Sequence, residues 1–202
     1  RYTIKNKKYR KALDIVRKEL ECRKIDYAVI GGGAVQIHIG SLLGNVPQLE
    51  GLLRKTGDID IAVGADLSEM VVMFNELAQR YKDISNRAVG AAVIGGVNIS
   101  CFVPGQLKGF ENYHNLVLQE SSVKQVDFRS IPIVARVENP EMIIAAKLTG
   151  SYKPKDIFDI EQLCLALKTE RLDEKKILCF LKRLGHEDKI EVFRSIVSQQ
   201  SS

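Results

Sequence analysis

The sequence contains no tryptophan, and aromatic residues account for only 6% of its 202 positions. It also lacks any unbroken run of about 20 apolar residues, the length that a membrane-spanning helix needs. Its first residues, RYTIKNKKYRKALDIV, contain no apolar stretch of the kind found in signal peptides. We therefore expect a protein without a membrane span. Because the chain begins with arginine, we also expect its natural start to lie upstream.

Cysteine is scarce, and its four positions are far apart: Cys22, Cys101, Cys164 and Cys179. The sequence contains no C-x-x-C pair and no histidine at the spacing of a zinc ligand. This pattern argues against a structural zinc site. It is typical of a reduced chain, so we expect a cytoplasmic protein.

The residues that are abundant predict a folded, mildly basic protein. Hydrophobic residues make up 45% and charged residues 27% of the sequence, a balance that supports a buried core and excludes a disordered chain. Lysine and arginine number 30 against 25 acidic residues, which gives a net charge of +5 and a pI near 9.0. Such an excess suits a polyanionic partner, although many proteins without one share it.

Apolar periodicity divides the chain into an α/β part and a helical part. The expected helices of the first part cover residues 7–23, 34–43 and 66–81. Its expected strands cover 27–30, 58–63, 91–94, 97–103, 115–119, 123–128 and 131–137, with a loop at 44–57. After Asn139 the pattern is helical throughout, over 140–150, 155–168, 173–184 and 186–198. We predict an α/β (α+β) fold with a mixed β-sheet core flanked by helices over residues 1–137, and a helical C-terminal part over 138–202 packed on that core.

The most distinctive chemical feature is the pair Asp58 and Asp60 in an otherwise apolar strand. Residues two apart in a strand project from the same side, about 6.5 Å apart along the chain. Two carboxylates placed in this way repel each other and are costly to bury, and a divalent cation bound between them would remove the conflict. Oxygen ligands favour Mg²⁺ or Mn²⁺. The alternative is a strand end in water, with the acids either solvated or paired to Arg54 and Lys55, since short motifs of this kind often occur without a metal.

Three consecutive glycines, Gly31, Gly32 and Gly33, separate the first expected strand from the next helix. Glycines at such a junction allow backbone N–H groups to approach a ligand closely, and the helix N-terminus adds positive potential. This arrangement suits a triphosphate. The segment matches neither G-x-G-x-x-G nor the Walker A pattern, so a tight turn without a ligand is an equal alternative.

The order of these two motifs resembles a known family. YAVIGGGAVQIHIG followed by RKTGDIDIAV is similar to the nucleotidyltransferase fold, and within it to the AbiEii/AbiGii and MenT toxin-type nucleotidyltransferases, whose members read roughly GG-x-A-L and then R-x-[ST]-x-D-I-D. The resemblance implies a nucleotidyltransferase-like sheet, a glycine turn that holds the triphosphate, and metals on Asp58 and Asp60. It also implies phosphate contacts from Arg54, Lys55 and Thr56, although the Thr56 hydroxyl is equally well explained as part of a simple turn.

A third motif supports the same subgroup, which carries a late lysine on one helix and K-D-x-x-D-[LI] at the start of the next. Here Lys147 precedes Lys155-Asp156 and Asp159. The two acids lie on one helical face near the positive N-terminus of the helix, and Lys147 is placed to reach a phosphate. The resemblance implies catalytic roles for Lys147, Asp156 and Asp159. Without it, the acids are ordinary helix caps and the lysine is a solvated side chain.

One departure from the wider fold concerns the general base. Many members carry a third carboxylate on a strand after D-x-D, but the expected strand at 97–103 offers only Asn98 and Ser100. Asp127 is the one acid in a comparable apolar setting. The toxin-type members use a late acid instead, which here would be Asp156 or Asp159, so the base is open among these three residues.

The resemblance implies an enzyme that moves a nucleoside monophosphate from an NTP to an acceptor hydroxyl, with Mg²⁺ or Mn²⁺ as the cofactor and pyrophosphate as the product. It also implies a tRNA or other RNA acceptor, a toxin–antitoxin or phage-defence setting, and an antitoxin protein as a partner. Three alternatives stay open: a small-molecule (antibiotic) acceptor, a protein acceptor, and a catalytically silent member that binds nucleotide or RNA.

Overall fold

The computed structural model describes residues 2–43, 45–87, 90–106, 111–127, 132–150, 153–168 and 172–200. Its α-helices are α1 (Lys7–Cys22), α2 (Gly31–Leu42), α3 (Leu67–Arg80), α4 (Glu111–Glu120), α5 (Pro140–Thr149), α6 (Pro154–Leu167), α7 (Glu174–Arg183) and α8 (Ile190–Gln200). Its strands are β1 (Tyr27–Ile30), β2 (Asp58–Val63), β3 (Ile84–Arg87), β4 (Ala91–Ile94), β5 (Val97–Phe102), β6 (Ser122–Val126) and β7 (Ile133–Val137). Short 3₁₀ helices occupy η1 (Pro47–Leu52) and η3 (Glu187–Lys189).

The strands form one seven-stranded mixed sheet in the order β3-β4-β5-β2-β1-β7-β6. Strand β1 pairs with β2 in the antiparallel sense and with β7 in the parallel sense, and β2 runs parallel to β5. The register places Ile30, the last residue of β1, opposite Asp60 near the start of β2. The start of α2 and the two aspartates of β2 therefore meet at one end of the sheet.

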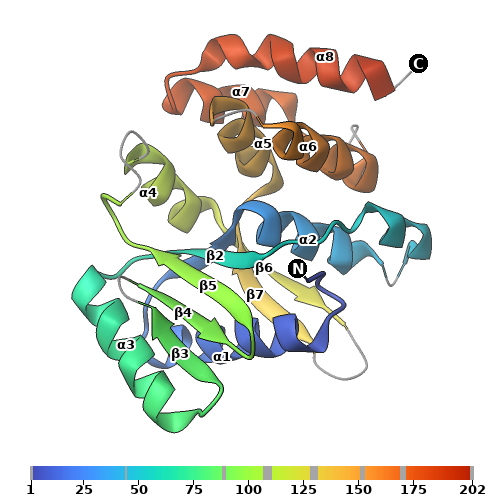
Figure 1. Ribbon diagram of the computed structural model, residues 1–202. Helices are drawn as coiled ribbons and strands as arrows, with labels where there is room; N and C mark the ends of the chain where they lie inside the picture. Colours follow the sequence, from blue (N-terminus) through green and yellow to red (C-terminus); the bar gives the residue numbers. More distant parts are fainter. Residues whose placement is uncertain are drawn as a thin grey trace.

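Helices cover both faces of this sheet. In Figure 1, α1 and α3 lie below the sheet, and α2 lies above it together with the helices of the C-terminal third. Helix α1 buries Tyr9, Leu13, Val16 and Leu20 at the spacing of one helical face. Apolar side chains from the strands, α3 and the late helices belong to a single hydrophobic core cluster.

The predicted fold class, a mixed sheet flanked by helices with a helical C-terminal part, is confirmed. Helix α3 begins as expected, because the Asp66 carboxylate accepts a hydrogen bond from the backbone N–H of Glu69 at 2.9 Å and caps the helix. The division at residue 137 stays a prediction. None of the helices in the described ranges is long and apolar enough to cross a bilayer.

Three elements differ from the sequence-based prediction. Helix α2 begins at Gly31, so the three glycines form its first turn and not a turn that precedes it. A further strand, β3, was not expected, and Asn115–Gln119, expected as a strand, belongs to helix α4. The buried side chains of α4, Tyr113, Leu116 and Val117, have helical spacing. A short apolar run of this kind is compatible with a strand or a helix, and packing against the core favours the helix here. The expected strand residues 128 and 131 lie outside the described residues.

Candidate active site

A cavity of about 860 Å³ opens where β2, the start of α2 and helices α5 and α6 meet. Its lining contains most of the residues that the three sequence motifs singled out: Gly31, Gly32, Arg54, Lys55, Thr56, Gly57, Asp58, Asp60, Lys147, Lys155 and Asp156. These residues come from segments that lie as much as 125 positions apart in the sequence (Gly31 to Asp156). The fold therefore brings the three motifs to one place.

Asp58 and Asp60 present their carboxylates to this cavity from the first half of β2. Within the part of the chain that the structure describes, neither carboxylate accepts a hydrogen bond or forms an ion pair. Burial and the adjacent charge of Asp58 raise the pKa of Asp60 to about 6. Of the two sequence alternatives, pairing with Arg54 does not occur, because the Arg54 guanidinium is held by another acid, whereas Asp58 is exposed to solvent and Asp60 is partly exposed.

That other acid is Asp159, whose side chain is fully buried at the first turns of α6. Arg54 donates to both of its carboxylate oxygens, with a distance of 2.6 Å from Nη2 to Oδ2. Lys147 of α5 places its Nζ 2.7 Å from Asp159 Oδ2. Burial alone would raise the pKa of Asp159, but the two cations outweigh burial and hold that pKa below its ordinary value. Asp159 thus joins the loop before β2 to helices α5 and α6.

Asp156, one turn before Asp159, lines the cavity. Its Oδ1 lies 3.1 Å from Lys147 Nζ, and its Oδ2 accepts a hydrogen bond from the backbone N–H of Lys153 at 3.0 Å, which caps α6. The capping role foreseen as an alternative is therefore real, and it coexists with a position in the cavity.

These positions narrow the choice of general base. Asp127 lies just beyond β6, the outermost strand, and is exposed, with a 2.8 Å hydrogen bond from Gln125. Because β6 is antiparallel to β7, and Val126 pairs with Ile133, Asp127 lies at the end of the sheet opposite Gly31. The structure therefore does not bring Asp127 to the cavity, and its candidacy as the base stays an untested prediction. With Asp159 fully buried, Asp156 is the only one of the three acids that contacts the cavity.

The glycine segment makes two different contacts. Gly31 has a φ of +59°, a conformation that glycine adopts without strain, and its N–H donates to Glu138 Oε2 at 3.1 Å. Gly32 lines the cavity, and a Cβ there would lie 2.7 Å from Arg54 Nη2. The glycine at this position therefore leaves room for the arginine beside the helix N-terminus.

Gly33 is buried and does not line the cavity, so the prediction that all three glycines cradle phosphates needs correction. A Cβ on Gly33 would lie 3.0 Å from the Tyr9 hydroxyl and 3.1 Å from Val29 Cγ1. The absent side chain allows α2 to pack closely on α1 and β1. The Tyr9 hydroxyl has no hydrogen-bond partner among the described residues, and burial followed by the charges of Asp60 and Asp58 raises its pKa.

Sequence reasoning missed Glu138, the buried acid behind the glycine turn. Its Oε1 accepts a hydrogen bond from the Tyr113 hydroxyl at 2.8 Å, while Oε2 takes the Gly31 amide. Burial raises its pKa to about 7 despite these bonds. The Glu138 backbone carbonyl lies 2.8 Å from His38 Nε2, so His38 is a packed histidine. No local motif marks Glu138, which follows the last strand and meets Gly31 only through the fold.

The remaining predicted residues have modest roles in the geometry. Lys55 is exposed at the rim of the cavity, and Lys155, which lies in the late motif, also lines it. Thr56 is largely buried, and its hydroxyl donates to the Asp58 carbonyl at 3.3 Å. The Thr56 hydroxyl therefore makes a simple turn contact, the alternative to a phosphate contact, although the residue also lines the cavity.

The residues present fit a divalent cation. The donor set is two adjacent carboxylates that have no cation in contact among the described residues, and burial, followed by the charge of Asp58, raises the pKa of Asp60. No group of three or more His, Cys, Asp or Glu side chains in the described ranges is arranged to hold an ion. An ion here would complete its shell with water and substrate phosphates, as Mg²⁺ commonly does.

Comparisons with known proteins add solved structures of similar architecture. No protein-family model matches the chain, and a search of curated proteins finds no match. The chain is similar to an antigenic nucleotidyltransferase-like protein from Paracoccidioides brasiliensis, at 18% identity, a TM-score of 0.48, and 89% and 93% coverage of the two chains. It is also similar to the antibiotic-resistance factor ANT(2'')-Ia in solution, at 16% identity, a TM-score of 0.46, and coverage of 96% and 92%.

A third similar structure is ANT(2'')-Ia in complex with adenylyl-2''-tobramycin, at 15% identity, a TM-score of 0.47, and coverage of 96% and 99%. These TM-scores are below 0.5. The functional inference that follows therefore rests on the contacts within the cavity and not on these similarities.

Proposed function

We propose that the protein is a nucleotidyltransferase that moves a nucleoside monophosphate from an NTP to an acceptor hydroxyl, using Mg²⁺ or Mn²⁺. The observation that carries the proposal is the pair Asp58 and Asp60. These are two carboxylates without partners among the described residues, on one strand, facing a cavity that also contains a helix N-terminus and four basic side chains. A purely structural site has no use for an unrelieved acid pair.

The chemistry is an in-line displacement at phosphorus. The acceptor hydroxyl loses its proton, for which Asp156 is the candidate base, and its oxygen forms a bond to the α-phosphorus. The bond from that phosphorus to the bridging oxygen breaks, and pyrophosphate leaves with the electron pair. When bound, the divalent ion neutralises phosphate charge and polarises the α-phosphate. Asp58 and Asp60 would hold that ion, and the work of the protein is positioning and electrostatic stabilisation.

The cationic wall of the cavity would orient the triphosphate. Lys147 and Arg54 are fixed by Asp159, so their charges are held in place before the substrate arrives. Lys55 and Lys155 are exposed and free to close on phosphates from the rim. The first turn of α2, with Gly32 in the lining, presents positive potential to the same space.

For the acceptor we favour RNA, in particular tRNA. The resemblance to AbiEii/AbiGii and MenT toxin-type proteins supports this choice, and the net charge of +5 agrees with it. The same resemblance supports a toxin–antitoxin or phage-defence setting, with a neutralising protein as partner. All four cysteines are free thiols, which agrees with the proposed cytoplasmic location.

The test is transfer of radiolabel from the α-phosphate of each NTP, with Mg²⁺, to total RNA and to total protein from a bacterial extract. We expect a labelled band of tRNA size with the wild type and with the control Asp127→Asn, and no band with Asp60→Asn. A labelled protein band would support the nucleotidyltransferase activity and show that the acceptor is a protein and not RNA. Absence of label in every fraction, together with absence of pyrophosphate release, would overturn the proposal.

A further inference from the structure

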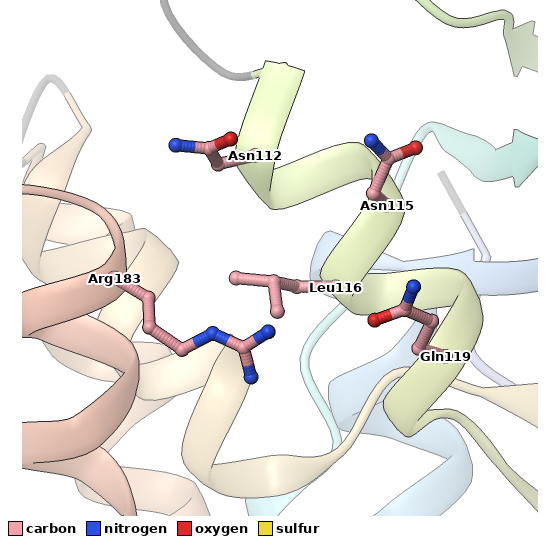
Figure 2. Close-up of a pocket in the computed structure, with 5 residues that line it drawn as sticks. All are labelled: Asn112, Asn115, Leu116, Gln119 and Arg183. Atoms are coloured by element: carbon pink, nitrogen blue, oxygen red, sulfur yellow. The ribbon is translucent and has the colours of Figure 1, made fainter.

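A second cavity, of about 360 Å³, lies between helices α4 and α7. We call it the α4–α7 groove. Its lining is Asn112, Asn115, Leu116 and Gln119 from α4 and Arg183 from the end of α7. Figure 2 shows the Arg183 side chain extending from α7 toward Leu116 and Gln119, with the two asparagines farther along α4. None of these residues belongs to the lining of the candidate active site.

The polar side chains of the groove have unused hydrogen-bonding capacity. Asn112, Asn115 and Gln119 lie on one face of α4 because their spacing is three and four residues. All three amides and the Arg183 guanidinium are exposed, and none of them has a hydrogen bond or ion pair within the described ranges. No carboxylate lines the groove, so a cation is not the expected ligand.

The chemistry of the groove matches one class of ligand. Carboxamides donate and accept in the same plane, and a guanidinium both donates in a plane and stacks on flat rings. Leu116, almost fully buried, offers an apolar floor. A molecule with an apolar face and polar edges satisfies all of these groups, and the nucleobases have that form.

We propose that the α4–α7 groove binds an unpaired base of the nucleic-acid acceptor. This inference rests on the proposed function and specifies how its substrate is recognised. It assigns to Asn115, Gln119 and Arg183 the contacts that select single-stranded nucleic acid. Such base readout is the usual mode of recognition for unpaired RNA.

The groove is connected to the active site through contacts of α4 and α7. Tyr113, which lies between Asn112 and Asn115 on α4, donates to Glu138, and Glu138 accepts from the Gly31 amide. On the other side, α7 packs on α5, the helix that carries Lys147. Both walls of the groove are therefore anchored to elements that form the catalytic cavity, so an acceptor held in the groove is held relative to that cavity.

The test is fluorescence anisotropy with a short, labelled, single-stranded RNA of mixed sequence, at physiological salt and without NTP. Arg183→Ala and the double variant Asn115→Ala/Gln119→Ala should each bind about tenfold more weakly than the wild type, the loss typical of one base contact. The matched control is Lys182→Ala, which removes the same charge from the neighbouring exposed position outside the groove and should change binding less than about twofold.

An abasic strand of the same length distinguishes base contacts from phosphate attraction. We expect the wild type and all variants to bind the abasic strand equally and weakly. Equal binding of the abasic and base-bearing strands by the wild type would overturn the proposal, as would an Arg183→Ala effect no larger than that of Lys182→Ala. Competition by free mononucleotides as effective as that of the strand would assign the groove to a free nucleotide and overturn the acceptor role.

These outcomes are separable from the fate of the proposed function. If Asp60→Asn keeps full transfer while the groove variants lose RNA binding, the catalytic assignment fails and the groove stands. If the wild type transfers label to RNA while the groove variants bind and react normally, only the groove assignment fails. The substituted polar side chains are exposed, so we expect unchanged melting temperatures.

Discussion

Asp58 and Asp60 on β2, and Asp156 and Asp159 on α6, lie around the same cavity in different electrostatic surroundings. The α6 acids are balanced: Asp159 contacts Arg54 and Lys147, and Asp156 contacts Lys147 and a backbone N–H. The β2 acids have no such contacts among the described residues, and the pKa of Asp60 is raised to about 6. For Asp159 the pKa is shifted in the opposite direction.

This difference separates two uses of the same side chain. An acid whose charge is neutralised by neighbouring cations serves as scaffold, because its removal leaves those cations unbalanced. An acid pair left without cations stores electrostatic repulsion, which a bound ion can relieve. Residue type and spacing alone do not distinguish the two cases. The presence or absence of a cation in contact with the carboxylate does.

The largest expected effect comes from the β2 pair. Asp58→Asn and Asp60→Asn should each lower the rate of transfer roughly a thousandfold or more, since a catalytic metal supplies several kcal/mol of charge stabilisation. The melting temperature should stay within a few degrees or rise, because one of two repelling charges is removed. Transfer assays and thermal unfolding of the same preparations check both parts. Loss of the fold in both variants would show that the acids are structural.

The reverse pattern is expected for Asp159. Asp159→Ala leaves Arg54 and Lys147 without their shared counter-ion in a buried position and should cost about 3–5 kcal/mol of unfolding free energy. The matched change Asp156→Ala, at a partly exposed cap, should cost about 1 kcal/mol. Urea denaturation measures both. Equal costs would remove the distinction between the buried scaffold acid and the cap.

Glu138 adds a third case, a buried acid with hydrogen-bond donors but no cation in contact. Its pKa of about 7 in the folded protein lies above its unfolded value of 4.5. The buried charged carboxylate therefore destabilises the folded state above pH 7, and the protein gains stability as the pH falls from 7 to 4.5 and Glu138 becomes protonated. His38 acts in the opposite direction over part of this range, because burial lowers its pKa to about 4. Only a comparison of variants isolates Glu138.

Glu138→Gln keeps an acceptor for Gly31 and removes the titration. When the pH falls from about 8 to about 5, the unfolding free energy of the wild type should rise by about 2 kcal/mol relative to that of the variant, because only the wild type gains stability from protonation of Glu138. Urea denaturation at several pH values checks this expectation. Parallel pH profiles for the two proteins would contradict the assignment.

The smallest effect is expected at Asp127. Its exposed position beyond β6 predicts that Asp127→Asn changes the rate of transfer by less than about twofold. A large loss in this variant would support Asp127 as the base. A rate equal to that of the wild type leaves Asp156 as the acid to test next.

Much of the fold could be predicted because its signals are local. The apolar run before Gly31, the alternation in β2 and the cap at Asp66 each depend on a few neighbouring residues, and these elements occur where they were expected. The prediction failed where tertiary packing chose between two local possibilities, as in α4. There, Tyr113, Leu116 and Val117 have helical spacing, and that spacing was the signal available in the sequence.

Which residues form the site was predictable to a similar extent, but the contacts between them were not. The motifs supplied Asp58, Asp60 and Lys147, and the cavity brings them together. The contacts that decide their roles join residues about a hundred positions apart: 105 for Arg54 to Asp159 and 107 for Gly31 to Glu138. The local pattern of a sequence does not encode such pairings. The contacts of Arg54 and Lys147 with the buried Asp159, and that of Glu138 with Gly31, could therefore be found only from the structure.

The measurement that tests the central claim most directly is binding of Mn²⁺, followed by electron paramagnetic resonance, to the wild type, Asp60→Asn and Asp156→Asn. The contrast between the two acid pairs predicts that Mn²⁺ binds the wild type and Asp156→Asn with similar affinity, and that Asp60→Asn loses this binding. Equal binding by all three proteins, or no binding by the wild type, would contradict the assignment of Asp58 and Asp60 as the metal site.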